Sequence, residues 1–359
     1  MQTKKIEQEF HLIRLLVAIL IALMISFLAI CLVSDSPGQT MLSFLFGPFK
    51  TVRRMGNVVE MMIPLMFTGV SVSIMYSCNQ INMASEGAFF LGGVASSYVA
   101  VTWLLPRGIH PVLCIMVGGI MGSVVCGIPA LLYVKNRSLP VVSSLMINYV
   151  ALFAGLFVIN YIIRDPQAGY LCSYTFADSA VLPHLFSKTN IHFGLIIAIG
   201  VVIFGYFFLY RSKWGYSIRI IGKNDNFAKY SGINVIATIV GCQLLGGFIA
   251  GMGGAVEQLG MYTRFQYQQL SNHGFDGVLI AILAQYNPKF VPFAALFLGY
   301  IRVGADAMAR TSDVPVEIIN IIQATIIIFV AAERFLDGWK HRKIVKASQA
   351  AMAAEGGNK

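Results

Sequence analysis

The chain has 359 residues, of which 57% belong to the hydrophobic set AVILMFWYC and only 12% are charged. Soluble domains carry about 25% charged residues, and a mean hydropathy of +0.72 is more than a soluble core of this length can bury. A water-soluble enzyme, a disordered chain and a fibrous protein are therefore excluded.

The net charge of +10 could suit binding to nucleic acid, but the basic residues are dispersed between apolar runs, which is a signal of membrane topology. We predict an all-α, polytopic protein that contacts membrane lipids and no nucleic acid.

Ten apolar segments are predicted to cross or enter the membrane. The first follows Lys4 and Lys5 and is longer than the apolar region of a secretory signal, which is about 7–15 residues, so we expect it to be retained. The eighth is too short for a full crossing and ends before Asn287-Pro288, which indicates a half-helix. The ten segments are 12–34, 58–77, 84–104, 112–134, 145–163, 191–210, 236–256, 274–284, 291–305 and 316–334.

The distribution of charge predicts the orientation of these segments. With ten crossings and the N-terminus inside, most of the 26 Lys and Arg residues fall in inner loops, as membrane proteins prefer. The main exception is a basic cluster in the first outer loop, at residues 50–54. Both termini are predicted to be cytoplasmic, with a tail at 1–11, a transmembrane domain at 12–334 and a second tail at 335–359.

Small residues recur at helix-packing intervals. Gly118 and Gly122 form one GxxxG pair, and Gly247 and Gly251 form another. Glycine lets helix backbones approach closely in lipid, so we expect these helices to face protein.

Two loops stand out between the apolar segments. The outer loop 164–190 is long enough for a small structured cap. The inner loop 211–235 is basic, and Asn224 or Asp225 could cap a short amphipathic helix that ends at Gly232. This helix would lie at the cytoplasmic face.

No motif for covalent chemistry is found. Gly222-Lys223 is followed by Asn224, so the phosphate-binding motif of ATPases is missing, as are GxSxG and HExxH. The six cysteines lack CxxC spacing, and we expect neither a disulfide framework nor a metal site. The chain is therefore predicted to be non-catalytic and to bind no cofactor, so any uphill transport would use an ion gradient or another subunit.

Five polar residues near membrane depth are candidates for a translocation pathway. Asn82 and Glu86 lie in the polar stretch 79–87, which is either a broken helix along the pathway or a cytoplasmic turn in which Glu86 caps the next helix. Glu257 and Asp276 lie at the outer ends of the seventh and eighth segments, where capping alone would explain Asp276. Asn148 lies just inside the fifth segment, where a hydrogen bond across helices is the favoured role.

Four stretches resemble, in order, motifs of the ABC-importer permeases for branched-chain amino acids, simple sugars and nucleosides. Residues 81–87 resemble N-I-G-x-E-G-Q, with Met83 and Ala84 in place of Ile-Gly and Ala88 in place of Gln. Residues 143–151 resemble the L-M-L-N-Y-I-A stretch of the nucleoside members, and 274–288 resemble G-F-D-G…N-P. The loop between them resembles the loop that couples such permeases to their ATPase, through Trp214, Gly215, Arg219, Gly222, Asn224, Ala228 and Gly232.

The resemblance implies a permease subunit in a bacterial cell membrane that performs no covalent chemistry. It implies an ABC ATP-binding subunit that holds ATP and Mg²⁺, a second permease subunit and an extracytoplasmic substrate-binding lipoprotein as partners. The 143–151 and 274–277 stretches favour a nucleoside-like solute. A simple sugar or a branched-chain amino acid is an alternative solute, and a secondary transporter driven by an ion gradient is an alternative mechanism.

Overall fold

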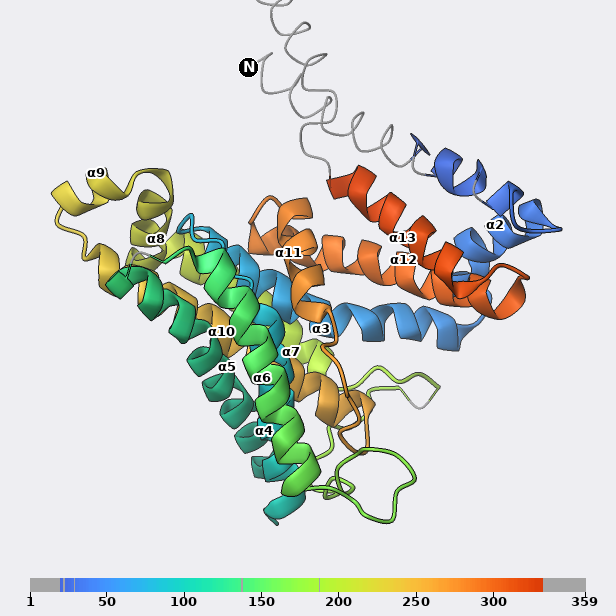
Figure 1. Cartoon of the computed structure of the whole chain (residues 1–359), viewed down its shortest axis with the longest axis horizontal. Coiled ribbons are helices and arrows are strands. Elements are labelled where there is room, and N and C mark those ends of the chain that lie inside the picture. The colour runs from blue at the N-terminus through green and yellow to red at the C-terminus, as the bar shows by residue number, and fades with distance from the viewer. Residues whose placement is uncertain (1–19, 22, 29, 137, 187, 332–359) are drawn as a thin grey trace, which may run out of the picture. The chain divides into compact units, whose positions relative to one another are not determined.

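The computed structural model describes residues 20–21, 23–28, 30–136, 138–186 and 188–331. Within these ranges the regular elements are helices, and β-structure is limited to two isolated bridges, which join Arg164 to Ser173 and His184 to His192. The elements in chain order are α2 (Pro37–Phe46), η1 (Gly47–Phe49), α3 (Val52–Tyr76), α4 (Ser85–Thr102), α5 (Ile109–Asn136), α6 (Pro140–Tyr161), α7 (Gly194–Arg211), α8 (Lys213–Lys223), α9 (Asp225–Tyr230), α10 (Val235–Met261), α11 (His273–Leu283), η2 (Pro288–Phe290), α12 (Val291–Thr311) and α13 (Val316–Ala331) (Figure 1).

The helical class that the sequence predicts is confirmed in the described residues. Each predicted segment from 58–77 onward contains a helix, and six helices are long and apolar enough to cross a membrane: α3, α5, α6, α7, α10 and the continuous η2–α12. Helix α11 has 11 residues, as the short eighth segment indicates. Both predicted tails, and residues 12–19, 22 and 29 of segment 12–34, lie outside the described residues. Helices α2 and α8 are additions that the sequence analysis did not predict.

The chain divides into two compact units, and the division falls within α12. One unit comprises residues 48–303 and the other comprises residues 1–47 together with 304–359. The larger unit contains α3 to α11, and it carries every candidate residue named above.

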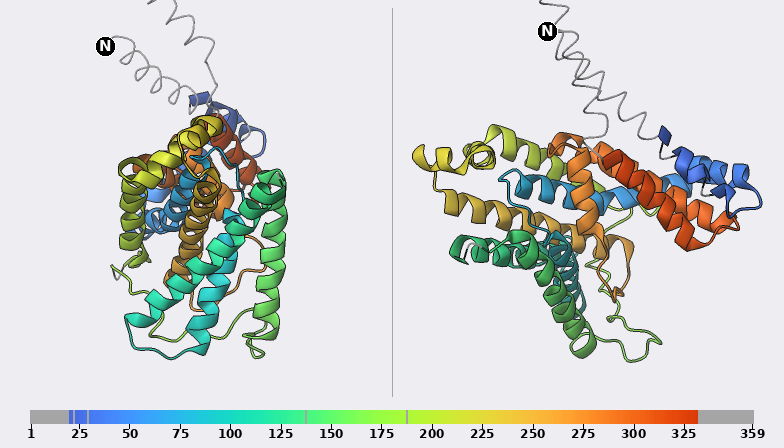
Figure 2. Two further views of the ribbon diagram at one scale, coloured as in Figure 1. Left: turned by 90° about the vertical axis from the view of Figure 1, so that its left-hand side faces the viewer. Right: turned by 45° about the horizontal axis from the view of Figure 1, so that its top comes forward.

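Helix α3 is the central helix of the larger unit. Most of its apolar stretch is buried within the protein, whereas only 28% of the corresponding stretch is buried in α6 and in α7. Helices α6 and α7 therefore expose long rows of apolar side chains, which is the pattern of membrane helices that face lipid. Figure 2 shows the helices of this unit from two further sides.

Glycines allow α4, α5 and α10 to pack backbone to backbone. A methyl group added at Gly122 would meet the carbonyl oxygen of Gly247, and one added at Gly251 would meet that of Gly118. On α4, Gly92 lies against the backbone of Gly251 in the same way. The two predicted GxxxG pairs are thus confirmed as the contact surface between α5 and α10.

Helices α3 and α4 form a hairpin whose turn lies beside the interior of α10. Along α3, Phe67 packs on Gly253, whereas the backbone of Met75 accepts a hydrogen bond from Gln243, at 3.4 Å. Helix α3 therefore runs antiparallel to α10 and ends near Gln243. The chain then turns over residues 77–84, and α4 runs back along α10, with Phe89 against Gly254. The N-terminus of α4 is consequently deep within the unit.

The smaller unit is held in part by one polar contact. The Asp313 carboxylate accepts hydrogen bonds from Ser34 Oγ at 2.7 Å and from the backbone nitrogen of Asp35 at 2.8 Å. These two donors, the Ser34 hydroxyl first, lower the pKa of Asp313. The contact joins the segment before α2 to the segment before α13.

Candidate functional site

The turn between α3 and α4 is fixed by the buried amide of Asn82. Its oxygen accepts a hydrogen bond from the backbone nitrogen of Ala84 at 2.9 Å, and its nitrogen donates to Gln243 Oε1 at 2.9 Å and to the Cys126 carbonyl at 3.2 Å. Asn82 is 1% exposed. One side chain thereby ties the turn to both α5 and α10, and this satisfies polar groups that would otherwise be unpaired inside the protein.

Asn148 fixes the start of α4 from the opposite side. Its Oδ1 accepts a hydrogen bond from the backbone nitrogen of Gly87 at 2.9 Å, and its Nδ2 donates to the Met83 carbonyl at 3.0 Å. The neighbouring Ser144 hydroxyl accepts from the Met83 backbone nitrogen at 3.0 Å. The hydrogen bond across helices that the sequence analysis favoured for Asn148 is therefore present, and it binds α6 to α4.

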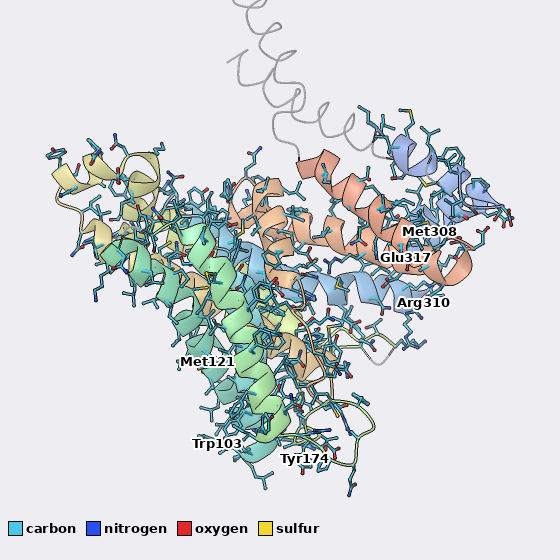
Figure 3. The ribbon with its side chains drawn as sticks, viewed as in Figure 1. Trp103, Met121, Tyr174, Met308, Arg310 and Glu317 are labelled. Atoms are coloured by element: carbon cyan, nitrogen blue, oxygen red, sulfur yellow. The ribbon has the colours of Figure 1, made fainter. Side chains whose placement is uncertain are left out.

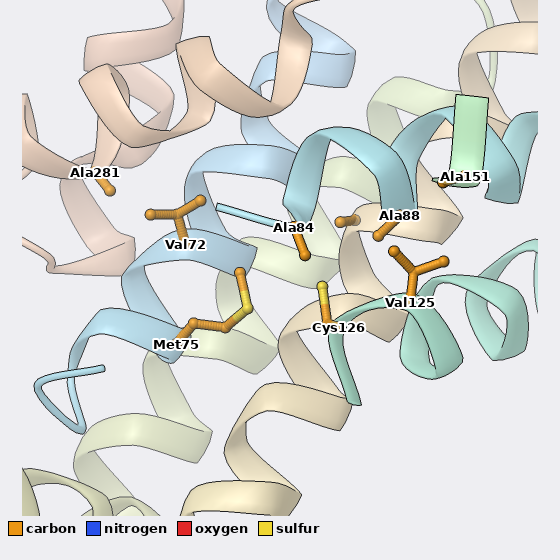
Figure 4. Close-up of a cluster of buried hydrophobic side chains, with 9 residues drawn as sticks. Val72, Met75, Ala84, Ala88, Val125, Cys126, Ala151 and Ala281 are labelled. Atoms are coloured by element: carbon orange, nitrogen blue, oxygen red, sulfur yellow. The ribbon is translucent and has the colours of Figure 1, made fainter. Parts of the chain in front are cut away.

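Around this turn the protein is packed with small apolar side chains. Val72 and Met75 of α3, Ala84 and Ala88 at the start of α4, and Ala281 of α11 belong to one buried cluster (Figure 4). The cluster also includes residues of α5, α6 and α10, and its alanines let these helices approach the turn closely. The part of the turn from Asn82 to the start of α4 is thus packed against protein, whereas Asn79 and Ile81 are exposed.

The Glu86 carboxylate joins the N-termini of α4 and α11. It lies in the first turn of α4 and is fully buried. Its Oε1 accepts a hydrogen bond from the backbone nitrogen of Asn272 at 2.7 Å, and its Oε2 accepts from that of Gly274 at 2.6 Å. Asn272 precedes α11 with φ of 64° and its own side chain makes no capping bond. Glu86 therefore supplies the cap of α11 from another helix, where the positive end of the helix dipole favours a carboxylate.

The contact between Glu86 and the start of α11 was not predicted by either reading of the 79–87 stretch. The sequence analysis considered Glu86 as a cap of the helix that follows it, whereas the structure shows it capping α11, nearly 190 residues further along the chain. The stretch is buried at Asn82 and at residues 84–87, but Asn79 and Ile81 are exposed. The broken-helix geometry is present, and the role of Glu86 in a pathway stays a proposal.

The Gly274-Phe275-Asp276-Gly277 stretch is explained by three contacts. A side chain at Gly274 would collide with the backbone of Glu86, and one at Gly277 would collide with Thr68 of α3. Asp276 forms an ion pair with Arg302 of α12. The capping role that would have explained Asp276 is taken by Glu86, and the Asp276 side chain instead connects α11 to α12.

Glu257 is the buried acid of α10 and contacts two residues near the start of α11. Its Oε1 accepts a hydrogen bond from the Tyr267 hydroxyl at 3.1 Å and lies 3.3 Å from Nε2 of His273. The His273 ring stacks on Phe89 of α4, with 5.2 Å between the ring centroids. Burial, and then the Glu257 carboxylate, raise the pKa of Tyr267. The hydroxyl therefore stays protonated and donates a hydrogen bond to Glu257.

The structure therefore brings Glu86, Glu257 and Asp276 to the same region through α11, whereas Asn82 and Asn148 hold the turn nearby. Sequence reasoning missed His273 and Tyr267, and it considered Asp306 rather than Asp276 as the partner of Arg302. It also missed Glu60, which lies within α3 and is 6% exposed. An acid inside an apolar segment is unusual, and this could have identified Glu60 from the sequence. No group of three or more His, Cys, Asp or Glu side chains that could hold a metal ion occurs in the described residues.

The loop 211–235 contains two helices rather than the one predicted. Helix α8 begins after Ser212, whose hydroxyl accepts a hydrogen bond from the backbone nitrogen of Gly215 at 2.9 Å. Gly215 packs against the carbonyls of Phe208 and Leu209, and Gly222 packs against the carbonyl of Ser77. The C-terminal end of α8 therefore rests on the turn between α3 and α4.

Helix α9 is the short helix that the sequence predicts, and its predicted ends are confirmed. Asn224 caps its start by accepting a hydrogen bond from the backbone nitrogen of Phe227 at 3.0 Å. Gly232 follows its end with φ of 78°. The backbone nitrogen of Ile233 donates to the Ala228 carbonyl and that of Gly232 donates to the Lys229 carbonyl, which together form a Schellman motif.

The α8–α9 surface combines exposed aromatic side chains with lysines. Trp214, Tyr216, Phe227 and Tyr230 are all more than half exposed, and Tyr230 is 92% exposed. Lys213, Lys223 and Lys229 are exposed on the same two helices. Arg219 and Ala228 instead have internal roles, since Arg219 stacks on the Tyr210 ring at 5.0 Å and Ala228 is fully buried.

The opposite end of the larger unit is formed by the 164–190 segment. Figure 3 places Trp103, at the end of α4, and Tyr174, in this segment, far from α8 and α9. The segment is tied to the bundle through backbone hydrogen bonds such as that from Ala177 to the Ala100 carbonyl, at 3.1 Å. An ion pair between Arg264 and Asp165 at 3.2 Å adds to these contacts.

Comparison with known proteins places this architecture in a family. Residues 54–331 match the family described as the permease component of branched-chain amino acid transport systems. The chain belongs to this permease family. It is a multi-pass membrane protein with six helices able to cross a membrane among the described residues, and the members of its family are transport components.

Individual relatives carry more specific names. The chain is 28% identical over 342 residues to the guanosine ABC transporter permease protein NupP of Bacillus subtilis, covering 93% of this chain and 97% of the relative. It is 26% identical to the nucleoside ABC transporter permease protein NupB of Lactococcus lactis, covering 84% and 85% of the two chains. It is 28% identical to the glucose ABC transporter permease protein TsgB13 of Haloferax volcanii, covering 79% and 77%.

Proposed function

We propose that this chain is the membrane-spanning permease subunit of an ATP-driven importer for a nucleoside-like solute. The relatives named for guanosine and nucleosides cover most of the chain, which supports this solute class. The glucose permease relative supports a simple sugar as the second candidate. The chain itself would bind no cofactor, and a separate ABC subunit would bind ATP and Mg²⁺.

The proposal includes the arrangement of the whole importer. The chain would pair with a second permease in a bacterial cell membrane and receive its solute from an extracytoplasmic binding lipoprotein. With about ten crossings and both termini in the cytoplasm, α8 and α9 would face the ATPase. The 164–190 segment would then face the binding lipoprotein.

The observation that supports an external motor most directly is the α8–α9 surface. Aromatic side chains at a protein surface are typical anchors of a docking interface, and lysines around them suit an acidic partner. Because Gly222 of α8 rests on Ser77, a displacement of α8 would push on the turn between α3 and α4. Asn82 and Glu86 connect this turn to α10 and α11, so the displacement would reach the buried polar residues.

Substitution of Phe227 tests this proposal. Phe227 is 57% exposed, so Phe227→Asp should leave folding unchanged but remove an interface anchor, which typically costs about 2 kcal/mol of binding. ATP-driven nucleoside uptake by the reconstituted importer should fall strongly, and less ATPase should copurify with the permease. Asn226→Asp, an exposed change on the same helix, is the control. Wild-type uptake and ATPase copurification in Phe227→Asp would contradict the proposed docking surface.

A further inference from the structure

Glu257 presents an acceptor atom that the protein does not use. The residue is 1% exposed. Its Oε1 accepts a hydrogen bond from the Tyr267 hydroxyl and lies near His273 Nε2. Its second oxygen, Oε2, is buried and has no hydrogen-bond partner among the described residues. An unpaired carboxylate oxygen in the interior of a membrane protein is costly, so a ligand that donates a hydrogen bond here would relieve a real penalty.

The surroundings of Glu257 narrow the chemistry of that ligand. Glu86 caps the start of α11 and Asp276 lies in its first turn, and the cation Arg302 is already paired with Asp276. A solute with its own carboxylate, such as a free amino acid, would meet this acidic region without an unpaired cation to bind it. A metal ion is disfavoured as well, because no suitable group of ligands occurs in the described residues. An uncharged solute that is rich in hydrogen-bond donors fits the site.

The residues around the site come from elements that the proposed mechanism would move. Glu257 lies on α10, His273 begins α11 and stacks on Phe89 of α4. The start of α11 is held by Glu86, next to the turn on which α8 rests. A small displacement of α11 would therefore change the distance between His273 and Glu257. Contact with a solute at Glu257 can thus differ between two states of the permease, as transport requires.

We propose that Glu257, positioned by Tyr267 and His273, is a solute-contact site that accepts a hydrogen bond from the sugar hydroxyls of a nucleoside during its passage. The inference rests on the proposed function and adds to it a named residue and the part of the solute that it binds. A sugar hydroxyl is neutral and both donates and accepts hydrogen bonds, so it can satisfy the free Oε2 atom.

The test compares two solutes in two forms of the complete reconstituted importer. Uptake of a ribonucleoside and of its 2′,3′-dideoxy analogue is measured for the wild type and for Glu257→Gln, per amount of assembled complex. The ratio of variant to wild type for each solute cancels the preference of the binding lipoprotein. Ribonucleoside uptake should fall about ten-fold, as expected when a buried polar atom loses its hydrogen-bond partner, whereas uptake of the dideoxy analogue should change less than about two-fold.

Controls separate a contact role from a structural one. Glu317→Gln makes the same change at an exposed position of α13 and should alter neither ratio. Should Glu257→Gln fail to assemble, Glu257→Asp keeps the carboxylate but withdraws it by one methylene, and it should reduce ribonucleoside uptake more than dideoxynucleoside uptake. Equal loss for both solutes, or no loss for either, would overturn the inference. Absence of ATP-driven uptake in the wild type would instead refute the proposed function.

Discussion

Glu86 illustrates how one side chain joins two elements that are distant in the sequence. Its two oxygens accept backbone hydrogen bonds from Asn272 and Gly274 at the start of α11. The sequence identified Glu86 as unusual because an acid lies beside an apolar segment. It did not identify the partner, since a cap supplied by another helix leaves no local pattern in the sequence.

Removal of the Glu86 charge should destabilise the larger unit. Glu86→Gln places an NH₂ group where one of the backbone donors points, so one hydrogen bond to a charged group is lost. The free energy of unfolding should fall by about 1.5–3 kcal/mol, measured by thermal unfolding of the purified chain in detergent. Asp225→Asn, at an exposed first-turn acid of α9, is the control. Equal stability of Glu86→Gln and the wild type would show that the cap contributes little.

The residues and contacts that sequence reasoning missed share a physical cause. His273, Tyr267 and Arg302 are ordinary residue types near the ends of apolar segments, and nothing local distinguishes them. Their importance arises from contacts with Glu257 and Asp276, which exist only after α10, α11 and α12 have packed. Asn148 was easier to interpret, because an amide within an apolar helix needs a partner.

At the scale of the elements, glycine spacing was the most informative signal. The pairs at 118 and 122 and at 247 and 251 predicted close packing, and the structure shows α5 and α10 in backbone contact there. Helix α8 was missed for a related reason. Its Gly215 and Gly222 reduce helix propensity, yet both are required where α8 packs on the end of α7 and on Ser77.

Two matched glycine substitutions test the packing of α10. In Gly251→Ala the new methyl group would meet the backbone of Gly118 on α5, whereas at Gly200 of α7 nothing lies within 4 Å of the added carbon. Gly251→Ala should lower the free energy of unfolding by about 1–3 kcal/mol because of overpacking. Gly200→Ala should be neutral or stabilising, by up to about 1 kcal/mol. Thermal unfolding of both variants distinguishes the cases, and an unaffected Gly251→Ala would contradict the close helix contact.

At the scale of the whole molecule, the chain belongs to a permease family, and we propose that a separate subunit drives its motion. Buried polar residues such as Asn82 and Asn148 hold the turn between α3 and α4, and α8 and α9 carry exposed aromatic side chains. Composition and motif order were sufficient to predict the class of protein. The hairpin of α3 and α4 inside the bundle was not predictable, because apolar length alone does not show how deep a helix begins.

The dependence of transport on a separate ATPase tests the central claim most directly. Nucleoside uptake is measured in proteoliposomes that contain the permease pair with its binding lipoprotein, with and without the ABC ATP-binding subunit, and with ionophores that collapse proton and sodium gradients. The account predicts uptake only when the ATP-binding subunit and ATP are both present, with no effect of the ionophores. Uphill uptake by the permease alone, driven by an ion gradient, would contradict it.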